Sequence, residues 1–265
     1  RSFRIFIGIY LSGQCAMDFV SGMAIYYVDE VLNGYGSGYL IMLMGVLMGS
    51  QLLGMLVFTP IMTRTSKRTT ILIGAPIRIV STLGLLAFSY EGAPIIPILA
   101  LAAGIGIGNA ATLTSIFAIL ADMADVDELI TSTSRPGIVS GMATFARKIS
   151  AGLSVWIIGI LLSLVGYDAK LAQSGIRQAL FTQRGIAMIF IIIPVVLVAF
   201  LLLFGYIFPI TNKEFTVVKQ DIARRRGEDD SVATDEEKRI LERATGFAYE
   251  DLWKKSNEHR IHNHK

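Results

Sequence analysis

The chain has 265 residues, 53% of them apolar, and its 24 basic residues nearly balance 21 acidic residues for a net charge of +3. Half of the basic residues follow residue 210, where acidic residues are equally numerous. No single-sign surface for phosphates is therefore expected, which excludes nucleic acid as a partner. The apolar residues form uninterrupted blocks that are too long for one soluble core.

Six apolar segments are long enough to cross a bilayer. A helix needs about 20 apolar residues to span roughly 30 Å of hydrocarbon. The segments are 5–28, 39–62, 70–90, 95–120, 138–165 and 186–210. We therefore predict an all-α, polytopic membrane protein with the bilayer as its first partner, divided into a transmembrane domain at 1–210 and a soluble tail at 211–265.

Basic residues gather before the first segment and between the second and third. They are Arg1, Arg4, Arg64, Lys67 and Arg68. Because short cytoplasmic loops are enriched in Lys and Arg, we expect both termini in the cytoplasm and the spans in the cell membrane. The chain has no initiator Met, so we expect it to be a piece of something longer.

The first segment carries polar residues inside hydrocarbon. Gln14 and Asp18 lie one turn apart on one face, and Asp18 is about 20 Å from the helix start. A charge at that depth costs about 2.5–3.5 kcal/mol. We predict that both residues face a cavity on a substrate or cation pathway; the alternative is that Asp18 only hydrogen-bonds a neighbouring helix.

The third segment contains Arg78, about 12 Å into the span. Arginine stays protonated, so we expect it to have an acidic partner. Snorkelling of its side chain to the membrane surface is the alternative.

The fourth segment ends in an acidic run. Asp122 and Asp125 share a helix face, while Asp127 and Glu128 are expected in the following loop. Candidate cationic partners for the run are Arg78, Arg135 and the basic turn that contains Lys67. The alternative is an ordinary solvated stretch of charge.

Glycines in the spans are expected to permit close helix packing. Gly104, Gly106 and Gly108 lie in an apolar span without a preceding strand, which argues against a nucleotide-binding loop. Gly45 and Gly49 fit the same interpretation.

The fifth segment is interrupted by Arg147 and Lys148. Adjacent helical residues are about 100° apart, so only one of them points inward. Lys148 lies about 15 Å beyond Ile138, near the midplane.

The tail is predicted to hold two short helices packed loosely on the cytoplasmic face. The first covers 214–226; the second begins at the capping box of Thr234 and Glu237 and ends at Gly246. A small apolar docking surface is expected beyond it, formed by Tyr249, Leu252 and Trp253. A terminal group of histidines, His259, His262 and His264, lacks a fixed geometry, so we predict no metal site.

The region from Ala121 to Tyr167 resembles the glycoside, pentoside and hexuronide cation symporters, a branch of the major facilitator superfamily that includes melibiose permease. The residues that carry the resemblance are Ala121, Asp122, Asp125, Glu128, Arg135, Gly137, Phe145, Ala146, Arg147, Lys148, Gly166 and Tyr167. Such transporters have two six-span halves, and this chain is similar to the carboxyl half. The resemblance implies an amino-terminal half as partner and import of a sugar or glycoside with Na⁺ or H⁺, without another cofactor.

The resemblance also implies roles for individual residues. It places Lys148 on the substrate and cation pathway. It assigns Asp122, Asp125, Arg135 and Arg78 to a cytoplasmic charge network that gates the cavity. The chain departs from the family pattern at two positions, where Pro136 replaces a usual Glu and Leu113 replaces a sugar-facing Trp.

Other functions stay open at this point. A membrane protein that assembles with others but transports nothing would not need Lys148 at the midplane. A lipid-like substrate would call for a wide apolar cavity. An enzyme is not expected, because the spans contain no paired nucleophile and base, metal-ligand set or phosphate loop.

Overall fold

The computed structural model of the protein describes residues 2–208 and 212–253, and every regular element there is helical. Six of the helices in this part are long and apolar enough to cross a membrane. They are α1 (Ser2–Tyr26, continued by the π-helical turn η1 at Tyr27–Val31), α2 (Tyr39–Arg64), α3 (Lys67–Gly84, continued by the 3₁₀ turn η2 at Leu85–Phe88), α4 (Ile95–Thr131), α5 (Pro136–Leu164) and α7 (Leu180–Ile207). The predicted all-α fold is confirmed.

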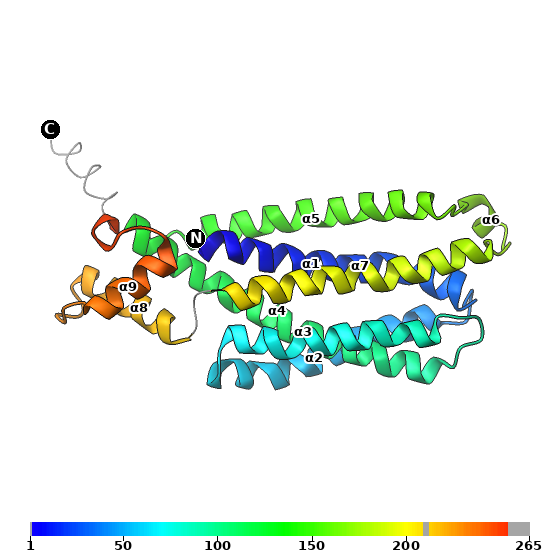
Figure 1. The fold of residues 1–265 in the computed structure, drawn as a ribbon, viewed down its shortest axis with the longest axis horizontal. Coiled ribbons are helices and arrows are strands. Elements are labelled where there is room, and N and C mark those ends of the chain that lie inside the picture. Colours follow the sequence, from blue (N-terminus) through cyan, green and yellow to red (C-terminus); the bar gives the residue numbers. More distant parts are fainter. Residues whose placement is uncertain (1, 209–211, 254–265) are drawn as a thin grey trace.

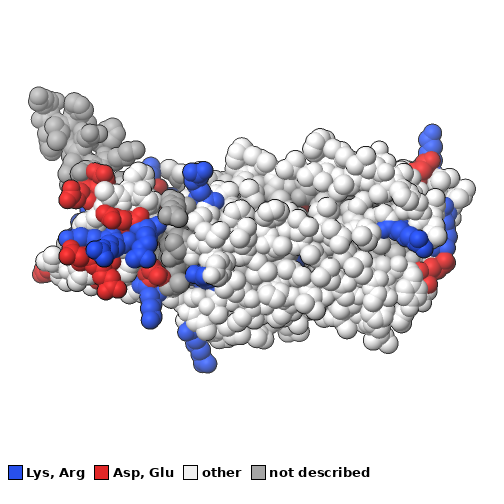
Figure 2. All heavy atoms as spheres, viewed as in Figure 1, with Lys and Arg blue, Asp and Glu red and all other residues white. Residues whose placement is uncertain are grey.

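Shorter helices lie at the two ends of this bundle (Figure 1). A single turn, α6 (Ala169–Gln173), joins α5 to α7, and the tail forms α8 (Asn212–Arg226), α9 (Asp235–Thr245) and a last turn η3 (Tyr249–Asp251). The N-terminus, the α2–α3 turn and the tail share one end, as the charge pattern predicted. Figure 2 shows charged side chains gathered at the two ends of the visible face, with a broad uncharged band between them.

Close helix packing is concentrated where α4 meets α2 and α3. A Cβ atom on Gly106 would lie 2.4 Å from the carbonyl oxygen of Leu47 in α2. A Cβ atom on Gly108 would lie 2.6 Å from the carbonyl oxygen of Gly74 in α3. These backbones approach each other only because side chains are absent there, so the predicted packing role of these glycines is confirmed.

The same expectation is wrong for Gly45 and Gly49, where an added Cβ would meet nothing within 4 Å. The reason is the rotation of α2, which packs on α4 through Leu47 and Gly54 instead. Its other face is open, and Leu56 there is 73% exposed.

Helix α5 is the most loosely held of the long helices. It packs chiefly against α1, and against α4 near the tail end. Its outer face carries large exposed apolar side chains, those of Phe145, Val155, Trp156 and Leu164.

The tail is packed firmly on the end of the bundle, so the expectation of loose packing is wrong. Val218 of α8 and Leu241 of α9 are fully buried in one hydrophobic cluster with Phe6 of α1 and Leu129 of α4. Leu252 is buried in the same cluster and is not free to dock another molecule. These apolar side chains make the tail a cap on α1 and α4.

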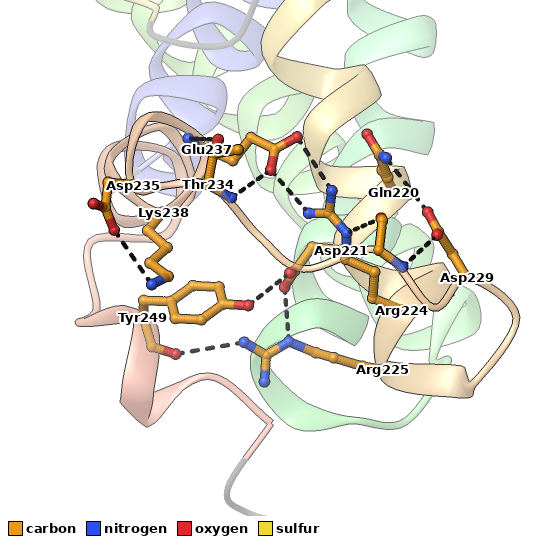
Figure 3. Close-up of polar contacts among 11 residues, drawn as sticks. Gln220, Asp221, Arg224, Arg225, Asp229, Thr234, Asp235, Glu237, Lys238 and Tyr249 are labelled. Carbon is orange, nitrogen blue, oxygen red and sulfur yellow. Dashed lines mark hydrogen bonds and ion pairs between the residues drawn. The ribbon is translucent and has the colours of Figure 1, made fainter.

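Polar contacts fix the internal shape of the tail (Figure 3). The carboxylate of Asp221, fully buried, accepts hydrogen bonds from Arg225 Nε at 2.7 Å and from Tyr249 Oη at 2.9 Å. Arg224 donates two hydrogen bonds to Glu237.

Both ends of α9 follow the sequence prediction. The Thr234 hydroxyl accepts from the backbone N–H of Glu237, whose carboxylate accepts from the N–H of Thr234. Gly246 ends the helix at a φ of 83°, a conformation that favours glycine. The three histidines considered as metal ligands lie outside the described residues.

Candidate functional site

An ion pair joins α1 and α5 within the apolar part of the bundle. Arg147 donates two hydrogen bonds to the carboxylate of Asp18, at 2.5 and 2.6 Å. The side chains are 33% and 16% exposed, so the pair is only partly covered. The bidentate geometry suits a guanidinium and a carboxylate and holds both side chains in one orientation.

The same interface contains further polar groups. Gln14, one turn before Asp18, is buried. Cys15 Sγ lies 2.7 Å from Ser150 Oγ of α5. Polar residues of α1 thus meet α5 at both Cys15 and Asp18, which lie about one turn apart.

Of the two adjacent cations in α5, Arg147 points toward α1, whereas Lys148 is exposed on the uncovered side. Only one of the two therefore points into the described chain, as expected, and Arg147 is the one that reaches a neighbouring helix. The reason is the bidentate pair, which a guanidinium completes better than an ammonium. A pathway role for Lys148 requires a further wall opposite α5 and stays a prediction.

A second polar cluster lies between α3, α4, α2 and α1, with Arg78 and Asn109 buried and Gln51 and Met17 partly covered. Arg78 is 1% exposed, and its Nη1 donates to Asn109 Oδ1 at 2.8 Å. Asn109 Nδ2 in turn donates to Gln51 Oε1 at 2.9 Å and contacts Met17 Sδ at 3.3 Å. The cluster cross-links four helices through uncharged partners.

The expected acidic partner of Arg78 is therefore wrong for the part of the chain that the structure describes. Asn109 precedes Asp122 by 13 positions in α4, which is about 20 Å at 1.5 Å per residue. Because Arg78 is bonded to Asn109, it lies away from the acidic run. Sequence reasoning missed Asn109 and Gln51 because, apart from Gln14, it weighed only charged residues within the spans. Their amides, set in apolar spans, were the available signal.

The acidic run lies at the tail end of α4, where each ion pair among the described residues uses a different cation. Asp122 pairs with Lys67 at the start of α3. Arg135 pairs with Asp127 at 3.1 Å. Lys67 belongs to the basic turn that was expected to pair with the run. Arg135 pairs with Asp127 rather than with Asp122 or Asp125, and Arg78 bonds to Asn109 instead.

Asp127 and Glu128 are helical rather than part of a loop, since α4 continues to Thr131. Glu128 is buried and pairs with Arg226 of α8, so the tail neutralises the end of the helix. Asp125 lies beside this pair in a cavity of about 250 Å³ that Lys219 also lines. The acidic run thus binds the tail through Glu128 and contacts α3 through Asp122.

The Asp18–Arg147 pair and the ion pairs at the end of α4 are suited to binding and releasing charged ligands and not to making or breaking covalent bonds. The carboxylate of Asp18 is shared with a single, partly exposed guanidinium, so a cation or a proton can compete for it. The pairs at the end of α4 connect four separate segments and break if those segments separate. Neither set supplies a nucleophile with a general base.

Residues 1–212 match a family described as MFS/sugar transport protein. A glucuronide carrier protein homolog of Escherichia coli is 28% identical over 78% of this chain and 44% of its own length. A putative sulfoquinovose importer of Salmonella typhimurium is 28% identical over 76% of this chain and 41% of its own length. An isoprimeverose transporter of Lactiplantibacillus pentosus is 30% identical over 72% and 39%, respectively. The chain matches less than half the length of each of these relatives.

Proposed function

The chain belongs to the sugar transport family of the major facilitator superfamily, and on that premise we propose that it is the carboxyl-terminal half of a secondary transporter. Its membership makes it a multi-pass membrane protein of a transporter family rather than an enzyme. The proposed activity is import of a sugar or glycoside with Na⁺ or H⁺ by alternating access, together with an amino-terminal half. Residues 1–210 would form the transmembrane half-domain and 211–265 the tail.

The observation that carries this proposal is the partly exposed Asp18–Arg147 pair beside the exposed Lys148. Charges in a membrane helix persist where they face a polar cavity or a partner. The open side of α5 offers such a cavity once a second half faces it. A lipid-like substrate is disfavoured by three charges at this position.

Coupling follows from competition for one carboxylate. A cation or proton that binds Asp18 would weaken its hold on Arg147, so that the guanidinium, together with the already exposed Lys148 ammonium, would bind substrate hydroxyl or acidic groups. Binding of one ligand then favours binding of the other, which is the energetic linkage that symport requires. Gln14 would supply a neutral hydrogen-bonding group on the same path.

The ion pairs at the tail end would act as the gate. Lys67–Asp122 and Arg226–Glu128 join the ends of α3, α4 and α8. If the chain spans the cell membrane with both termini in the cytoplasm, these pairs would hold the cytoplasmic side of the transporter closed. Arg135, through its pair with Asp127, and Asp125, beside the Arg226–Glu128 pair, would add to this gate. Arg78 lies away from it, on Asn109.

The test is uptake into vesicles by this chain co-expressed with the amino-terminal six-helix part of the E. coli glucuronide carrier homolog. Co-purification of the two chains shows that they assemble. Uptake of labelled glucuronide is then measured under an imposed Na⁺ or proton gradient. We expect gradient-dependent accumulation that Lys148→Leu abolishes and Lys170→Leu, at the far end of the bundle, leaves intact. Accumulation by the Lys148→Leu variant equal to that of the parent would contradict the assigned site.

The isolated chain provides the second arm. We expect no saturable uptake of glucuronide by this chain alone, because one wall of the cavity is missing. Saturable uptake by the isolated chain would overturn the proposal that it is half of a transporter.

A further inference from the structure

A separate cavity of about 310 Å³ lies at the end of the bundle away from the tail. It is formed where η1 and the loop after it face the α5–α6 connection. Its lining combines two carboxylates with three tyrosines: Asp29, Glu30, Tyr26, Tyr35 and Tyr167. Glu30 follows Asp18 by 12 positions, about 18 Å along the helix, so this cavity is distinct from the α1–α5 ion pair.

Glu30 is the unusual group in this cavity. It is only 3% exposed, and its Oε1 accepts a hydrogen bond from Tyr35 Oη at 2.5 Å. Its Oε2 is buried and has no hydrogen-bond partner among the described residues. A buried carboxylate oxygen without a partner is costly, so this atom requires a ligand or a cation.

The cavity also holds an uncompensated charge. No Lys or Arg in residues 2–208 and 212–253 forms an ion pair with Asp29 or Glu30, whereas Glu91, at the same end of the bundle, pairs with Arg177 at 2.5 Å. The two acidic residues are adjacent on the π-helical turn η1. Single π-helical turns inside helices often mark functional positions.

The aromatic walls indicate which cation would fit. Tyr26 and Tyr167 meet edge to face, with ring centroids 5.2 Å apart. Tyrosine faces attract organic cations, and quaternary ammonium groups are commonly bound in cages of such rings. A hard metal ion would instead require about six oxygen ligands at 2.0–2.6 Å, which the rings and neighbouring alanines do not supply.

We propose that this cavity binds a small organic cation with an ammonium group. Glu30 and Asp29 neutralise its charge, while the faces of Tyr26, Tyr35 and Tyr167 enclose its alkyl substituents. The proposal does not depend on sugar transport, because the cavity is formed entirely by residues of this chain.

The test is calorimetric titration of the purified full chain in neutral-lipid nanodiscs with tetramethylammonium chloride, using sodium chloride at equal ionic strength as reference. We expect saturable binding of tetramethylammonium and none of sodium. Glu30→Gln is expected to weaken binding about tenfold or more, because it removes the charge that faces the ligand. Tyr35→Phe, which keeps the ring, is expected to weaken binding less than Glu30→Gln does.

The matched control is Glu91→Gln, which removes a carboxylate at the same end of the bundle but outside the cavity. Its affinity should equal that of the parent. A melting curve for each variant separates loss of binding from loss of fold, and Tyr35→Phe serves if Glu30→Gln does not fold. Absence of saturable binding by the parent, equal affinity of a folded Glu30→Gln variant, or equal binding of sodium would overturn the proposal.

Discussion

Two parts of the bundle differ in how they are held together. The block of α2, α3 and α4 is joined through glycine contacts at backbone distance and through the buried Arg78–Asn109–Gln51 cluster. Helix α5 leans mainly on α1, where the Asp18–Arg147 pair remains partly exposed. The block is closely packed, as a protein interior is, whereas the exposed apolar face of α5 is typical of one side of an interface.

The difference follows from the chemistry of each contact. Glycine contacts gain dispersion energy only if neither backbone moves, so they favour a rigid unit. A partly exposed ion pair can exchange its partner for water or for a ligand at small cost. Rigidity in the block and adaptability at α5 are what a moving half-domain requires.

The largest expected effect comes from adding one methyl group to the block. In Gly108→Ala the new Cβ would lie 2.6 Å from the Gly74 carbonyl oxygen and 2.8 Å from the Arg78 backbone nitrogen. Because backbone atoms cannot turn aside, we expect a loss of about 1–3 kcal/mol or more in stability. Thermal unfolding of the detergent-solubilised chain measures this loss.

The matched change in α5 is Gly159→Ala, which would meet nothing within 4 Å. Here alanine gains up to about 1 kcal/mol of helix propensity, so the melting temperature should stay the same or rise slightly. Equal melting temperatures of the two variants would remove the contrast between the block and α5.

The second prediction compares the polar contacts of the two regions. Asn109→Ala removes the acceptor of Arg78 Nη1 and leaves a buried guanidinium unpaired, which should cost about 1–3 kcal/mol. Asp18→Asn leaves Arg147, whose side chain is 33% exposed, free to reach water and should cost less. Chemical unfolding followed by circular dichroism ranks the two variants; a larger loss for Asp18→Asn would show that α5 is the more firmly held region.

The six spans could be predicted from the sequence because span length is set by the bilayer and each apolar block exceeds it. The start of α4 at Ile95 was predicted as well, but its C-terminal end was not. Apolar content stops near residue 120, yet α4 continues to Thr131 because its carboxylates find partners on Lys67, Arg135 and Arg226. Those partners come from segments whose approach only the tertiary structure reveals.

The candidate site was predictable in its residue types and not in its pairings. Asp18 stood out as a charge in an apolar span, but helical periodicity does not state which helix lies beside it. The resemblance placed Lys148 alone on the pathway, and only the rotation of α5 shows that Arg147 is the residue beside Asp18. Asn109, an uncharged amide, carried too weak a signal to be matched with Arg78.

The third prediction concerns the tail, which packs on α4 of the block. Thr234→Ala removes the capping box of α9 and should destabilise that helix by about 1 kcal/mol. Hydrogen exchange should then rise in α9 and at the end of α4 near Leu129, while α5 keeps its protection. A rise in α5 alone would show that the tail supports the other region.

The smallest expected effect is a pH dependence of the tail. The pKa of Glu237 lies below its usual range, first because Arg224 donates hydrogen bonds to the carboxylate and then because the Thr234 backbone N–H does. A lowered pKa in the folded state means that the stabilisation is complete above the pKa of a free glutamate, about 4.3, and is lost as the pH falls through the lower folded value.

Fluorescence of Trp253 in a Trp156→Phe background reports the tail, and it should be constant between pH 7 and about pH 5 before changing at lower pH. Glu237→Gln should shift the tail signal at neutral pH and flatten its acid response, whereas Glu236→Gln, at an exposed neighbouring position, should behave as the parent does. An acid response that is unchanged in Glu237→Gln would assign the transition to another carboxylate, such as those of α4. The stability of the tail would then depend on its contacts with α4 of the block more than on the contacts within the tail.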